Sequence, residues 1–83
     1  MSDFKSLTLE LYNHEIEVTF KPGTESFKKY GKSIKGMLMR RIWGEQTVSG
    51  QNISTVVGIT LQVRSEEINI SFLEILKMEK LTI

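Results

Sequence analysis

The chain has 83 residues, of which 40% are hydrophobic and 25% charged, with a formal net charge of +1 and no cysteine. This length suits one small domain, residues 1–83, and is too short for two domains or for a core that also encloses a cofactor-sized cavity. The lack of cysteine excludes disulfides, a thiol nucleophile and thiolate metal sites, and it favours a reducing, cytoplasmic setting. Residues 1–5 include an acid and are followed by no apolar run, so neither a signal peptide nor a membrane span is expected.

The first expected element is a β-hairpin over residues 6–21. Leucines at 7, 9 and 11 alternate with polar residues, and the apolar residues at 16, 18 and 20 do the same. Asn13-His14 lies between the two runs and suits a two-residue turn, because Asn tolerates a positive φ. If residue 12 faces residue 15, every inward residue meets another inward residue, as a sheet with one buried face requires.

A helix is expected next, over residues 25–43. Thr24 is a good N-cap, Glu25 suits the positive end of the helix dipole, and Gly44 is a natural stop. Between them the apolar residues recur at helical spacing, at positions 27, 30, 34, 37, 38 and 42. The competing interpretation is that residues 34–43 form a strand, which would favour a small β-barrel.

Residues 45–55 are polar and are expected to form a loop. A second hairpin follows over residues 57–72, in which residue 64 faces residue 67 and Ile59 faces Phe72. The tail has two interpretations. Ser71-x-x-Glu74 is a capping-box pattern that could begin a helix. We favour instead a strand with a bulge near Leu73 that continues to Leu76, with residues 81–83 as a short last strand.

These elements predict an α+β fold of the order ββαββ, with a short sixth strand as an addition. One helix packed on a mixed sheet would bury all three apolar faces. The order of elements resembles that of β-grasp, or ubiquitin-like, folds. The resemblance is one of topology only, so it implies a fold and no function.

Positive charge is concentrated in one stretch of the sequence. Seven of the eleven basic residues lie between Lys21 and Arg41, where Glu25 is the only acid. On the expected helix five of these bases form a basic face together with one thioether and one aromatic ring: Lys28, Lys29, Lys32, Lys35, Arg40, Met39 and Trp43. Such a face attracts an acidic protein surface or nucleic-acid phosphates, with Trp43 available to stack on a base, or it is simply solvated.

A second candidate surface is acidic. In the expected first hairpin Glu10 and Glu17 face each other on the outer side of the sheet, and Tyr12 lies on the same face. Like charges directly opposite are mildly destabilising, so the pair is either tolerated because it is exposed, neutralised by a nearby base, or used to dock a basic partner. The sequence indicates no catalytic set, no metal ligands and no cofactor.

The pattern favours a small, non-enzymatic binding protein, such as an adaptor, regulator or inhibitor, that docks a charged face on a protein target. A small Lys- and Ile-rich domain of this kind is typical of phages and mobile elements. The alternative is a nucleic-acid-binding protein that uses the basic helix. A membrane partner is disfavoured because the apolar arc of that helix is needed for the core, and a dimer through an edge strand is a further option.

Overall fold

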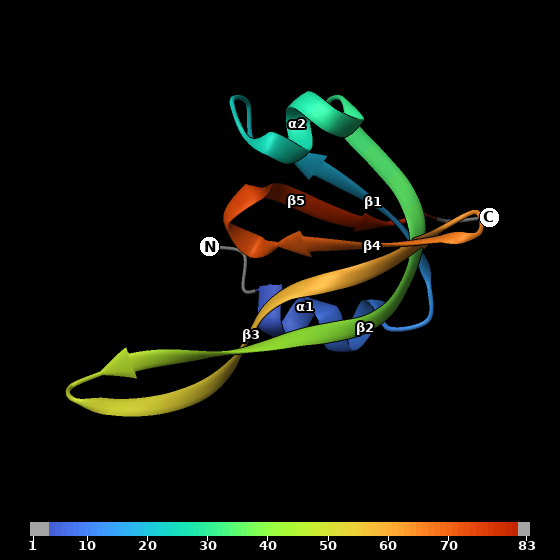
Figure 1. The fold of residues 1–83 in the computed structure, drawn as a ribbon. Helices are drawn as coiled ribbons and strands as arrows, with labels where there is room; N and C mark the ends of the chain where they lie inside the picture. Colours follow the sequence, from blue (N-terminus) through green and yellow to red (C-terminus); the bar gives the residue numbers. More distant parts are fainter. Residues whose placement is uncertain (1–3, 82–83) are drawn as a thin grey trace.

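The computed structural model describes residues 4–81, whose strands form a single five-stranded antiparallel sheet in the order β4-β3-β2-β1-β5. In chain order the elements are α1 (Phe4–Leu11), β1 (Glu15–Phe20), α2 (Glu25–Tyr30), β2 (Ser33–Val48), β3 (Gln51–Val63), β4 (Glu66–Ser71), the 3-10 turn η1 (Phe72–Glu74) and β5 (Ile75–Lys80) (Figure 1). The expected α+β class is confirmed.

Strand β2 is shared by two halves of the sheet. It pairs with β1 from Ser33 to Met37, and with β3 from Met37 to Val48. At the change of partner a Cβ on Gly36 would lie 2.7 Å from the carbonyl oxygen of Gln62, so only glycine fits this close approach. Figure 1 shows β2 curving strongly here, which brings apolar residues of both halves into one core.

That core is built mainly from isoleucine, leucine and valine, which lie on the inward faces of the strands and, at Leu11, on α1. Its buried members are Leu11, Ile16, Val18, Phe20, Leu38, Ile59, Leu61, Ile68, Ile70, Ile75 and Met78. Residues from all five strands contribute, so the hydrophobic effect stabilises both halves of the sheet together.

The two helices lie at opposite ends of the curved sheet in Figure 1, and both pack residues against the same core. Helix α1 buries Leu11 and Thr8, and the Thr8 hydroxyl donates to the carbonyl oxygen of Lys5 at 2.8 Å, so this buried polar group is satisfied. Helix α2 starts as expected at Thr24, whose hydroxyl accepts from the Phe27 amide at 3.2 Å. Gly31, with a φ of 88°, ends it after six residues.

The expected hairpin over residues 6–21 is wrong in its first half. Residues 4–11 are helical, because Phe4, Leu7 and Leu11 also satisfy a helical period and pack against the core together, while Leu9 is 61% exposed. Asn13 does adopt the expected positive φ, of 64°, but its turn joins a helix to a strand.

The expected helix over residues 25–43 is wrong beyond Tyr30, and the competing strand interpretation of residues 34–43 is correct. The pairing of β2 with β3 shifts between Leu38 and Arg40, so Met39 forms a bulge. A bulge adds one residue to a period of two, so the apolar spacing across it mimics a helix. The small barrel tied to this interpretation is not seen, because the sheet is open: within residues 4–81 no pairing joins β4 to β5.

The expected loop over residues 45–55 is also wrong. These residues belong to β2 and β3, which continue to a tight turn at Ser49-Gly50. The hairpin β3–β4 is confirmed, but its turn is Arg64-Ser65 and Ile59 faces Ile70. This register differs from the expected one by two residues, an even number, so the same side chains point inward.

The tail forms neither the expected bulged strand nor a longer helix. Ser71 caps a single 3-10 turn by accepting from the Leu73 amide at 3.2 Å, and β5 then begins at Ile75 beside β1. Leu81 lies outside β5, and the rest of the expected last strand lies outside the described residues. Because every strand pair is antiparallel, the expected mixed sheet and β-grasp-like order are wrong.

Candidate functional site

The residues expected on one basic helix face are spread over several elements. Two of them, Lys28 and Lys29, lie on α2, and Lys32 lies between α2 and β2. The others lie on β2: Lys35, Met39, Arg40 and Trp43. Arg40 forms an ion pair with Glu67, and the Lys29 ammonium lies 5.4 Å from the centre of the Tyr30 ring. The geometry that the basic-helix interface requires is therefore absent, and the binding roles of these residues stay predictions.

The expected acidic face is not formed either. Glu10 lies on α1 and Tyr12 just after it, whereas Glu17 lies on β1, in register with Lys35 on one side and Glu79 on the other. The Glu17 carboxylate accepts a hydrogen bond from the Ser33 hydroxyl at 3.1 Å. Glu17 therefore belongs to a mixed-charge patch on the sheet, which fits neutralisation by a nearby base better than an acidic docking surface.

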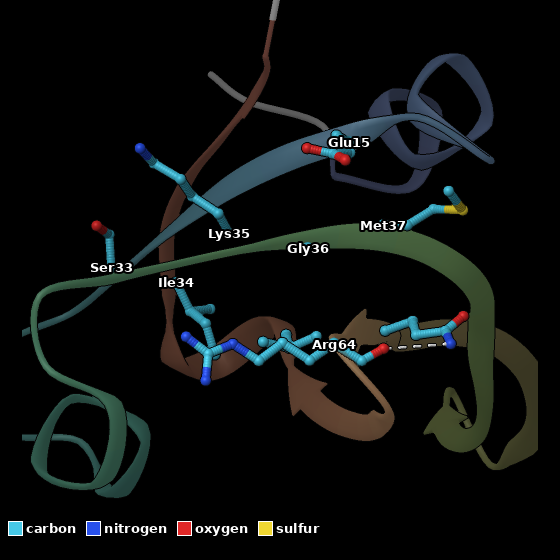
Figure 2. Close-up of a pocket in the computed structure, with 9 residues that line it drawn as sticks. Glu15, Ser33, Ile34, Lys35, Gly36, Met37 and Arg64 are labelled. Carbon is cyan, nitrogen blue, oxygen red and sulfur yellow. Dashed lines mark hydrogen bonds between the residues drawn. The ribbon is translucent and has the colours of Figure 1, made fainter.

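An open basin of about 700 Å³ lies where β2 changes partner, and it is lined by Glu15, Ser33, Ile34, Lys35, Gly36, Met37, Gln62, Val63 and Arg64. Figure 2 shows the side chains of Lys35 and Arg64 on opposite sides of β2, so these two cations do not converge on one point. The Ser33 hydroxyl is already engaged by Glu17. The basin therefore offers no convergent set of groups for catalysis or for tight anion binding.

Metal ligands are likewise not gathered in the part of the chain that the structure describes. No cluster of three or more His, Asp or Glu side chains there could hold a metal ion. None of the helices in the same residues is both long and apolar enough to cross a membrane.

The most distinctive feature is a two-stranded arm, residues 43–56, which projects from the sheet in Figure 1. In it Trp43–Val48 pairs with Gln51–Val56, beyond the point where β1 and β4 stop pairing with β2 and β3. Ser49 and Gly50 both have positive φ, of 52° and 78°, as the hairpin turn that matches strand twist requires. Most arm side chains are exposed, on both faces.

Two shallow grooves flank the base of the arm. The first, of about 230 Å³, lies beside α1 and includes Leu9, Arg41, Trp43 and Val56. The second, of about 260 Å³, lies beside η1 and includes Val56, Val57, Phe72 and Leu73. Leu9, Trp43 and Leu73 are 61%, 59% and 81% exposed. We call Leu9, Arg41, Trp43, Val56, Phe72 and Leu73 the arm-root surface.

A cation and an aromatic ring lie together on this surface. The Arg41 guanidinium lies over the Trp43 ring, 5.4 Å from its centre, within the range of a cation–π interaction. Trp43 is 59% exposed, so most of the indole stays accessible beside this contact. Tryptophan and arginine of this kind often supply most of the binding energy in protein interfaces.

Sequence reasoning found only Trp43 of this surface, and gave it a different purpose. Leu9 was not predicted to be exposed, because the alternating pattern placed it on the buried face of a hairpin. Leu73 was not predicted as a site residue, because it was expected in a bulged strand. One sequence signal could have indicated the exposure of Leu9: residues 4–11 contain more apolar residues than one face of a helix can bury.

Comparisons with protein-family models, with curated proteins and with solved structures found no match for this chain.

Proposed function

We propose that this chain is a small, non-enzymatic binding protein that docks on a protein target through its arm-root surface. The observation that carries the proposal is the exposure of Leu9, Trp43 and Leu73 around one short segment of β3. Small soluble domains rarely leave several large apolar side chains together in water unless a partner covers them.

The arm itself adds support for a protein partner. A ribbon of two strands without a third strand or a helix against it is marginally stable in water. Residues 43–56 carry one charge, at Glu45, so this ribbon makes no strong electrostatic contact of its own. A partner that packs against the base of the arm would order it and bury Trp43.

This docking surface differs from the charged face that the sequence favoured. Lys28, Lys29, Lys35 and Arg40 lie on α2 and β2 without forming one face, and Arg40 already has an acidic neighbour. In the proposed function these charges keep the domain soluble and steer its approach to the target, while the apolar arm-root surface supplies the affinity.

A photo-crosslinking experiment tests the proposal. A photoreactive residue in place of Leu9 is expected to capture a protein from extract of the chain's own source, and excess unlabelled chain should compete. Excess R41A/W43A chain should not compete, because it lacks the cation and the ring. A photoreactive residue in place of Leu76, which is 53% exposed and lines neither groove, is the matched control. Equal capture from the Leu9 and Leu76 positions would refute docking at the arm-root surface. Equal competition by the unmodified chain and the R41A/W43A chain would refute it as well.

Nucleic-acid binding remains a second candidate, supported by one local observation. The exposed residues Lys21, Lys28, Lys29 and Lys32 lie within residues 21–32, opposed there only by Glu25. Fluorescence of Trp43, the only tryptophan, can be followed while short DNA and RNA are added at two salt concentrations. Salt-sensitive quenching that K28E/K29E abolishes would favour this candidate over a protein target.

A further inference from the structure

Strand edges in this sheet are of two kinds. The outer strands β4 and β5 end the sheet, and both carry charges: Glu66 and Glu67 at the start of β4, and Lys77, Glu79 and Lys80 along β5. Charged side chains are a common way in which proteins prevent an exposed edge from pairing with another strand. Charges therefore interrupt both edges, at the start of β4 and along β5.

The edge of the arm formed by residues 51–56 of β3 has no such protection. Within residues 4–81 no strand pairs with this edge, because the pairing of β3 with β4 stops at Gly58. The stretch from Gln46 to Val63 contains no charged residue and no proline. Residues 51–54 are exposed, and Ile53, Thr55 and Val56 are β-branched, as strands favour. We call residues 51–56 the arm edge.

The hairpin register shows which backbone groups the arm edge offers. In a two-residue hairpin the residues that flank the turn, here Val48 and Gln51, exchange hydrogen bonds, and bonded pairs alternate with non-bonded pairs along the ribbon. Gln46 and Ile53 are then the next bonded pair, whereas the backbone groups of Asn52 and Ser54 point away from β2. These outward groups are free to pair with another strand.

From this geometry we propose that the arm edge pairs with the arm edge of a second copy of the chain. Two antiparallel copies of β3 would form a four-stranded ribbon related by a twofold axis. In such an interface each residue meets a residue of the same segment, so any charge would lie close to its own copy. The arm edge carries none, and this neutrality is what self-pairing requires.

The other edge of the arm fits a second copy less well. On β2 the outward backbone groups are those of Glu45 and Thr47, by the same alternation. Pairing of this edge with itself would bring two Glu45 carboxylates close together across the axis. The proposed dimer therefore uses β3. It rests on the outward backbone groups of Asn52 and Ser54 and not on the side chains of Leu9, Trp43 and Leu73, so it does not depend on the proposed function, although the two surfaces share Val56.

The test is the oligomeric state of the full chain, measured by analytical ultracentrifugation from about 1 µM to 1 mM. We expect a concentration-dependent species of twice 9.5 kDa. Ser54→Pro removes one outward N–H without removing a bond within the arm, and should weaken dimerisation at least about tenfold. Its matched control is Glu45→Pro, because Glu45 is the cross-strand partner of Ser54 and its N–H points to the opposite edge.

A pair of charge variants decides the matter even if the proline variants fold poorly. N52K/S54K and N52E/S54E should each be monomeric, and an equimolar mixture of the two should form dimers, because opposite charges then meet across the axis. Amide exchange should also be slowed at Asn52 and Ser54 in the unmodified chain at high concentration. A chain that stays monomeric, a dimer indifferent to Ser54→Pro, or a dimer lost on Glu45→Pro would each overturn the proposal.

Discussion

The sheet core and the arm are made of the same two strands, β2 and β3, yet different forces hold them. In the core, inward residues such as Leu38 and Ile59 are fully buried, and their burial fixes the register. In the arm, residues 43–56 are mostly exposed, and the ribbon is held by its backbone ladder and its turn. One strand can therefore pass from a packed environment to a solvated one within a few residues, and only the first part contributes strongly to stability.

The largest expected effect comes from truncating the same residue type in the two regions. Ile70→Ala, at a site that is 1% exposed, should lower the free energy of unfolding by about 2–5 kcal/mol, because it leaves a cavity. Ile53→Ala, at a site that is 45% exposed, should change it by no more than about 0.5 kcal/mol. Urea unfolding at low protein concentration measures both. Equal losses would mean that the arm is part of the cooperative core.

Two glycines sharpen the same comparison. A Cβ on Gly58 would lie 2.4 Å from the carbonyl oxygen of Ile70, so Gly58→Ala should destabilise the whole domain by about 1–3 kcal/mol. Gly50 meets no atom within 4 Å but has a positive φ, of 78°, so Gly50→Ala strains only the arm turn. The second variant should speed amide exchange in the arm without shifting the melting temperature. A lower melting temperature for Gly50→Ala would show that the arm unfolds with the core.

The contrast also explains which elements the sequence could predict. The hairpin β3–β4 and the start of α2 were predictable, because alternation over residues 57–63 and the cap at Thr24 are local signals. Helix α1 was not, because Thr8 counted as polar although its hydroxyl is satisfied within the helix and the side chain is buried. Period two and a helical period fit those few residues equally well, and packing decided between them.

The candidate site was less predictable than the fold. Periodicity finds strands through their buried side, and the arm has no buried side over most of its length, so its residues looked like a loop. The bulge at Met39 then shifted the apolar spacing of β2 and suggested a helix whose basic face does not exist. Trp43 was recognised as exposed, but its neighbours Leu9 and Leu73 come from elements far away in the sequence.

A smaller effect is expected where a side chain joins two elements at the margin of the core. The Glu74 carboxylate accepts from both the amide and the hydroxyl of Ser26, each at 3.0 Å, and so ties η1 to α2. Because hydrogen bonds to a charged group are stronger than neutral ones, Glu74→Ala should cost about 1–3 kcal/mol. Glu66→Ala, at an exposed site, should stay within about 0.5 kcal/mol in the same urea assay. A loss no larger than that of Glu66→Ala would show that the tie does not stabilise the fold.

The smallest effect on stability is expected on the exposed face of β5, where Lys77 Nζ lies 2.7 Å from Glu79 Oε1. The hydrogen bond to Glu79, and then the charge of that carboxylate, raise the pKa of Lys77 above its ordinary value of 10.5. Desolvation lowers this pKa and the charge of Glu17 raises it, but both effects are smaller. Because the folded pKa is the higher one, the contribution to stability is complete below pH 10.5 and is lost as the pH rises through the folded pKa. The site is fully exposed, so the contribution is small and salt weakens it further. Lys77→Met and Glu79→Gln should reduce the alkaline fall of the free energy of unfolding with pH to the same extent. Different slopes for the two variants would mean that the pair does not act as one unit.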